Sequence, residues 1–209
     1  MRKEILISEW NRKAHFEFFN SFTEPFFGIT TTVDITKAFY RAKEANASLF
    51  LYYMHACMSA VNQVDSFKIR LEGDKIYQYD TIHASTTTNR KDLPFAFAFL
   101  PFKESLKEFI EQSTINLDEA RMMSGLGMGE ENKRLDLVHY STLPWIEFSS
   151  ISHPRNFNYK DSVPKITFGK ISKNGDRFII PISIHVHHGI MDAQDVAEFL
   201  EKYHQQLNK

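Results

Sequence analysis

The chain has 209 residues, of which 43% are hydrophobic and 24% are charged, and its formal net charge is -1. These values predict one globular domain, residues 1–209, and they exclude a strongly basic nucleic-acid-binding protein. No apolar run approaches the roughly 20 residues that a membrane-spanning helix needs. The N-terminus also lacks the apolar core of a signal peptide, so we expect a cytoplasmic protein with neither a membrane nor a nucleic-acid partner.

The first third of the chain predicts helices around a single strand. Helical spacing and β-branched enrichment predict, in order, a helix at residues 8–19, a strand at 28–35 and helices at 36–46 and 48–64. Ser8 is a possible N-cap of the first helix. The single cysteine, Cys57, excludes an internal disulfide, and its apolar helical surroundings favour a buried thiol.

The middle of the chain predicts a hairpin followed by two strands and a helix. Residues 67–79 alternate apolar and polar residues on both sides of Gly73-Asp74, which is typical of a hairpin turn. The patterns that follow predict strands at residues 82–88 and 95–102, a helix at 103–123 and a glycine-rich mobile loop at 124–133.

The last third predicts mainly strands and ends on a helix. The strands are expected at residues 135–140, 145–151, 165–172 and 177–187, with a polar loop at 153–163, a tight turn at 173–176 and a helix at 193–207. This order predicts an α/β domain with runs of antiparallel pairing rather than a regular array of βαβ units.

Adjacent histidines end the last predicted strand. By strand alternation, His188 shares the face of Ile184 and Val186, and His187 points to the other face. Histidine transfers protons near neutral pH and a strand end is a rigid support, so the sequence favours His188 as a general base. A histidine packed in the core is the alternative interpretation.

Asp192 lies directly before the final helix. It is predicted as the helix N-cap, with Asp195 near the positive end of the helix dipole. Support of a catalytic site by Asp192 is compatible with that cap.

Other chemistries find less support in the sequence. His185, His187, His188 and Asp192 carry metal-ligand atoms, but opposed strand faces separate His188 from the other two histidines, so no metal is expected. The nucleophile elbow Gly-x-Ser-x-Gly is absent, as are the Gly-x-Gly-x-x-Gly and Walker-type loops.

Residues 187–193, His-His-Gly-Ile-Met-Asp-Ala, resemble the His-x-x-x-Asp-Gly signature of the chloramphenicol acetyltransferase family. Further segments resemble this family in the same order along the chain: residues 9–19, 33–36, 73–80, 143–150, 166–170 and 175–177. The resemblance extends over nearly the whole chain. It implies the family's two-layer α/β sandwich, with a mixed, largely antiparallel sheet packed against helices, and a homotrimer with active sites between subunits. The 19 phenylalanines suit such an interface or an apolar pocket.

The resemblance implies two catalytic residues. His188 is the general base that removes the proton from an acceptor hydroxyl, which then attacks the thioester of acetyl-CoA directly. Ser150 matches the serine that hydrogen-bonds the tetrahedral oxyanion. Acetyl-CoA is then a co-substrate, and no permanently bound cofactor is expected.

Three residues match supporting positions of the family. Asp192 matches an aspartate that pairs with a buried arginine, here Arg12, although a surface ion pair of Arg12 with another acid is the alternative. Thr167 matches a threonine that holds a water near the reacting centre, and an ordinary strand threonine is the alternative.

Three further residues are expected at substrate-binding positions. Phe19 and Phe27 match aromatic residues that line the acceptor pocket, with plain core packing as the alternative. Lys170 is expected along the CoA tunnel, where it could contact a phosphate, with a solvated lysine as the alternative. Two positions depart from the family pattern. Ala193 replaces the family glycine, and alanine is expected to be tolerated there if residue 193 is the first residue of a helix. Pro25 replaces a cysteine that several members carry in a pocket-lining loop, so a different acceptor pocket is expected.

The implied activity is chloramphenicol O-acetyltransferase, and the implied biological role is antibiotic resistance. One alternative is a CoA-dependent O-acetyltransferase that acts on another small hydroxylated acceptor. A second is a non-catalytic relative that retains the drug or CoA pocket. Dihydrolipoyl acyltransferases share the signature, but this sequence shows no Pro/Ala-rich linker or lipoyl segment.

Overall fold

The structure is a computed structural model, and it describes residues 1–91 and 93–209. The strands are β1 (Arg2–Ile5), β2 (Phe26–Asp34), β3 (Ile69–Glu72), β4 (Lys75–Tyr79), β5 (His83–Thr88), β6 (Ala96–Leu100), β7 (Leu137–Thr142), β8 (Lys165–Phe168), β9 (Ser172–Asn174) and β10 (Arg177–His187). The α-helices are α1 (Lys13–Phe19), α2 (Thr36–Glu44), α3 (Leu49–Gln63), α4 (Leu106–Met122) and α5 (Ala193–Leu207). Short 3-10 helices are formed by η1 (Ile7–Glu9), η2 (Asp65–Lys68) and η3 (Glu130–Lys133).

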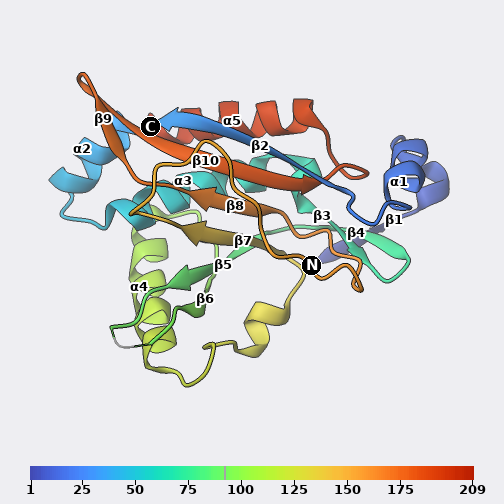
Figure 1. Ribbon diagram of the computed structural model, residues 1–209, viewed down its shortest axis with the longest axis horizontal. Coiled ribbons are helices and arrows are strands. Elements are labelled where there is room, and N and C mark those ends of the chain that lie inside the picture. Colours follow the sequence, from blue (N-terminus) through green and yellow to red (C-terminus); the bar gives the residue numbers. More distant parts are fainter. Residues whose placement is uncertain (92) are drawn as a thin grey trace.

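A large mixed sheet runs through the molecule in the order β2-β10-β8-β7-β5-β6, and β9 pairs with β10 (Figure 1). The pairs β5–β7 and β7–β8 are parallel, and the other pairs are antiparallel. A second, small sheet contains β1, β4 and β3. Helices α3 and α5 pack against each other and share the buried core with β10, as the two-layer α/β prediction requires.

The two faces of β10 differ in chemistry because its side chains alternate. Ile182, Ile184 and Val186 are fully buried in the hydrophobic core that the helices cover. Ser183 and His185 project from the opposite face. This outer face also carries Thr167 and Lys165 of β8, the register partners of Ser183 and His185.

Local signals set several element boundaries where the sequence predicted them. Gly73 and Gly175 have φ angles of 62° and 60°, which only glycine adopts readily, and both lie in hairpin turns. Asp192 and Asp195 form a capping box, so α5 begins at Ala193 as predicted. Cys57 is buried in α3, as predicted.

Three predicted elements form only in part as predicted. The first helix does not begin near Ser8, because a 3-10 turn and the extended Trp10 interrupt the chain and α1 begins only at Lys13. The strand predicted at residues 165–172 is divided into β8 and β9. The loop predicted at residues 124–133 contains the 3-10 helix η3.

The strand predicted at residues 145–151 does not form. Strand β8 already pairs with β7 and β10, so no edge near this segment is open to another strand. The segment instead crosses the sheet and packs over Gly169, where an added Cβ would lie 2.9 Å from the Phe148 ring. The backbone N–H of Lys170 donates to the carbonyl of Ile146 at 2.8 Å.

Candidate functional site

His188 follows the last residue of β10 and lies among aromatic rings. Its imidazole stacks on Phe19, with ring centroids 4.1 Å apart, and the Phe27 ring lies 4.5 Å away. The backbone N–H of His188 donates to the Pro25 carbonyl at 2.8 Å. Nδ1 is buried and has no hydrogen-bond partner within the described part of the chain. Aromatic packing and the main chain therefore hold the ring, and both predicted pocket residues contact it.

Arg12 and Asp192 form an ion pair across 180 residues of sequence. Arg12 Nη1 lies 3.0 Å from Asp192 Oδ2 and 3.8 Å from Asp195, and Arg12 Nη2 lies 3.5 Å from the carbonyl oxygen of His188. The Arg12 hydrogen bond lowers the pKa of Asp192, and the Gln194 backbone N–H adds to this effect. One carboxylate thus caps α5 and pairs with Arg12, which joins the start of α1 to the turn that carries His188.

Replacing Arg12 by alanine is expected to lower the free energy of unfolding by about 1 kcal/mol, because the partly exposed Asp192 then loses a charged hydrogen-bond partner. Acyl transfer should also slow, since the turn carrying His188 loses a support. Denaturant unfolding and steady-state kinetics would measure both effects. Lys13→Ala, which changes the exposed neighbour on the same helix, is the matched control. Equal stability and rates in both variants would reject a supporting role for this pair.

Thr167 lies on β8, away from the His188 of the same chain. It is fully buried, and its Oγ1 lies 3.2 Å from His153 Nε2. Its register partner on β10 is Ser183, five residues before His188, which corresponds to about 17 Å along a strand. A single chain therefore does not bring Thr167 to its own His188.

Ser150 and Lys170 are both exposed and lie outside the strands. Ser150 is exposed in the irregular segment between β7 and β8, and Lys170 is exposed just after β8. Ser141, which was not among the predicted site residues, is the register partner of Thr167 on β7. A hydroxyl residue near the end of a buried strand, just before the family-like Pro144-Trp145, was the available signal.

Comparisons with known proteins identify the family of the chain. A family described as "Chloramphenicol acetyltransferase" matches residues 2–204. The chain belongs to the chloramphenicol acetyltransferase family. Chloramphenicol acetyltransferase 3 of Escherichia coli is 26% identical, with 97% of this chain and 95% of that protein covered, and the Bacillus pumilus chloramphenicol acetyltransferase is 24% identical, with 91% and 86% covered.

Solved structures confirm the predicted fold. A chloramphenicol acetyltransferase structure superposes with a TM-score of 0.87 at 27% identity, covering 99% of this chain and 100% of the other. A probable dihydrolipoamide acetyltransferase from Listeria monocytogenes gives a TM-score of 0.67 at 16% identity, with 99% and 94% covered, which shows a shared fold only.

The departure from the family signature at Ala193 is structurally tolerated. Ala193 is the first residue of α5 and follows the extended N-cap Asp192. Alanine is the strongest helix former, so this position requires no glycine-like backbone. The position needs neither a positive φ nor the absence of a Cβ.

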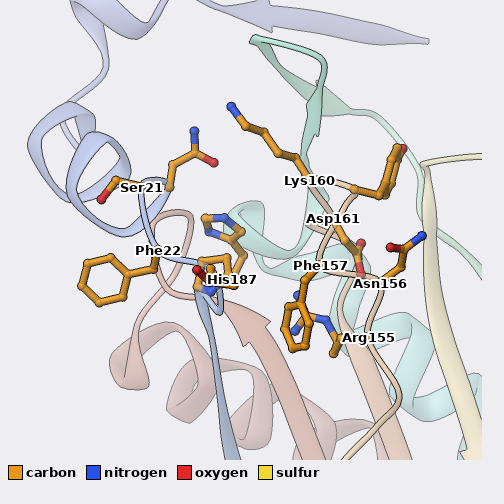
Figure 2. Close-up of a pocket in the computed structure, with 12 residues that line it drawn as sticks. Ser21, Phe22, Arg155, Asn156, Phe157, Lys160, Asp161 and His187 are labelled. Carbon is orange, nitrogen blue, oxygen red and sulfur yellow. The ribbon is translucent and has the colours of Figure 1, made fainter.

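Pro25 and His187 line a cavity of about 270 Å³ (Figure 2). Figure 2 shows His187 between the loop that carries Ser21 and Phe22 and the segment that carries Arg155 and Asp161. Burial lowers the pKa of His187 to about 4, so this imidazole is neutral near pH 7. The loop in which Pro25 departs from the family therefore lines a largely polar cavity.

A second cavity, of about 370 Å³, lies near the end of β7. Phe50, Tyr53, Thr142 and Ile171 are among its lining residues, and Arg121 supplies a positive charge. Thr142 follows Ser141, and Ile171 follows Lys170. Arg121 already pairs with Asp118 at 2.6 Å, so this largely apolar cavity suits an elongated apolar ligand.

Residues 1–91 and 93–209 contain no group of three or more His, Cys, Asp or Glu side chains arranged to hold a metal ion. None of the helices they form is both long and apolar enough to cross a bilayer.

Proposed function

We propose that this protein is a chloramphenicol O-acetyltransferase that transfers the acetyl group of acetyl-CoA to a hydroxyl of the drug. The observation that carries the proposal is the position of His188, which lies between Phe19 and Phe27 on a turn that Arg12 and Asp192 support. Membership of the family and the full-length match to its structures support it. Residues 1–209 act as one domain in this proposal.

His188 is the general base of the reaction. Because Nδ1 is buried, we assign the proton transfer to Nε2. Nε2 takes the hydroxyl proton, the oxygen forms a bond to the thioester carbon, and the carbon–sulfur bond then breaks. The imidazolium returns the proton to the thiolate of CoA, so the base is regenerated. Phe19 and Phe27 orient the ring and line the acceptor site.

The tetrahedral intermediate requires a hydrogen-bond donor for its oxyanion. Resemblance suggests Ser150, whereas position favours Ser141, because Ser141 lies in register with Thr167. Thr167 holds a water near the reacting centre in this scheme. Asp192 and Arg12 orient the site and transfer no protons.

Acetyl-CoA acts as a co-substrate in the proposal. The cavity at the end of β7 suits its pantetheine arm, since the lining is largely apolar and includes Thr142, the residue after Ser141. Lys170 is exposed next to Ile171, which lines that cavity, so its ammonium group suits a CoA phosphate.

The active site is proposed to lie between copies of the chain in a cytoplasmic homotrimer. Thr167 and Ser141 lie about 17 Å along the sheet from the His188 of their own chain, which is too far for one substrate hydroxyl to contact both groups. His188 of one copy would therefore act with Thr167 of its neighbour. Closed rotational symmetry repeats such a contact three times in a trimer.

Thiol release from acetyl-CoA, measured with and without chloramphenicol, tests the function directly. We expect drug-dependent release from the purified protein and acetylated chloramphenicol as the product. Release with another hydroxylated small molecule but not with the drug would favour an O-acetyltransferase of different specificity. Drug binding without any thiol release would instead identify a non-catalytic relative, and the assignment would fail.

A further inference from the structure

Polar side chains form rows across the outer face of the large sheet, next to Thr167. Lys165 of β8 is in register with His185 of β10 on one side and with His139 of β7 on the other. Register partners project from the same face of a sheet, and Thr167 lies two residues further along β8 on that face. Two imidazoles and an ammonium group therefore lie beside the residue that the proposed function places at the reacting centre.

The irregular segment before β8 adds a third imidazole to this face. His153 contacts Thr167 at 3.2 Å, and its ring lies edge-on to His185 with centroids 5.0 Å apart. Gly28 leaves the space that the His185 ring occupies, because a Cβ there would lie 2.6 Å from the ring. His187, two residues beyond His185, continues the face to the cavity of Figure 2. His139, His153, His185 and His187 are termed the imidazole row below.

The cations around this cavity already have carboxylate partners. Arg155 lies 2.9 Å from Glu24, Lys165 hydrogen-bonds to Asp161, and the exposed Lys160 lies 3.7 Å from Asp74. An anionic ligand would have to displace one of these carboxylates or add an uncompensated charge to a partly buried site, and both are costly. The charge balance therefore favours a neutral ligand.

The imidazole row offers both donors and acceptors. Burial is the main cause that lowers the pKa values of all four histidines, in His139, His153 and His187 to about 4. A neutral imidazole presents one donor and one acceptor, as a hydroxyl group also does. His153 Nε2 and His185 Nε2 already pair with the hydroxyls of Thr167 and Ser183, and His187 Nδ1 accepts from the Gly189 N–H. Ring nitrogens outside these bonds would lack partners beside an aromatic ligand, whereas a polyol would satisfy them.

We propose that the imidazole row and the adjoining cavity bind a neutral acceptor with several hydroxyl groups, a polyol or a sugar, and that the protein acetylates it in addition to chloramphenicol. The inference rests on the proposed function, because Thr167 links the row to the reacting centre. The chemistry is the same: an acceptor oxygen bonds to the acetyl carbon, its proton passes through His188, and the thiol of CoA leaves.

The test compares thiol release with sorbitol, xylitol, maltose and lactose, with glycerate as an anionic hydroxy acid, and with chloramphenicol. At least one neutral polyol should give a higher kcat/KM than glycerate. For the His153→Leu variant, we expect kcat/KM for the polyol, divided by kcat/KM for chloramphenicol, to fall about tenfold. The fall should come from a higher KM for the polyol, because one hydrogen-bonding side chain is lost. His153→Gln retains a donor and an acceptor and should restore most of that ratio.

Each other outcome contradicts a defined part of the proposal. Chloramphenicol acetylation without release from any polyol would overturn this inference and leave the proposed function intact. A preference for glycerate would overturn the neutral class of acceptor. A His153→Leu variant that lowers both activities equally would reduce His153 to a structural role and overturn the row as a binding site. No release with any acceptor would overturn the proposed function as well.

Discussion

Replacing His188 by alanine is expected to lower kcat/KM for acetyl transfer by a factor of about 10²–10⁴, the usual contribution of a positioned base. The fold should persist, because His188 is only half-buried and follows the last strand residue. Thiol-release kinetics with the purified variant would measure the loss. Circular dichroism would show whether the secondary structure is retained.

A matched control separates this effect from the loss of any imidazole. His204 is exposed on α5, so His204→Ala should leave both activity and folding near the wild-type values. If His188→Ala keeps a comparable rate, His188 is not the general base. A variant that loses activity only together with its secondary structure would make His188 a packing residue between Phe19 and Phe27.

Replacing Ser141 by alanine is expected to lower kcat by a factor of about 10²–10³ with little change in KM, as for the loss of one oxyanion donor. Ser150→Ala, at the exposed position between β7 and β8, should have a much smaller effect. The reason is geometric, since Ser141 lies in register with Thr167, whereas Ser150 lies in an exposed irregular segment. The reverse order of the two effects would assign the oxyanion to Ser150.

The Ser141→Ala variant also tests whether the active site is shared between subunits. Co-expression of Ser141→Ala and His188→Ala subunits should restore about a quarter of the sites if each site takes its histidine and its serine from different copies. Sites contained within one chain would gain nothing from mixing. Separately purified and unmixed variants provide the baseline for this experiment.

Local sequence patterns were sufficient where an element depends on its own residues. The helix at residues 193–207 was predicted with its correct bounds, because Asp192 and Asp195 form its capping box and its apolar face is regular. The hairpins around Gly73 and Gly175 followed from turns that require a positive φ. The segment at residues 145–151 was mispredicted because strand formation needs an open edge, and no local pattern shows whether β8 has one.

The candidate site likewise combines features that the sequence determines with features that only the fold determines. The sequence by itself determined the adjacent histidines, the Asp192 cap and, through ordered motifs over nearly the whole chain, the family. Only the tertiary structure decided that Phe19 and Phe27 contact His188, that Ser141 lies beside Thr167, and that four histidines gather on the outer face near paired charges. These contacts join residues far apart in the chain. They depend on strand register and on the packing of irregular segments, which single-residue patterns do not encode.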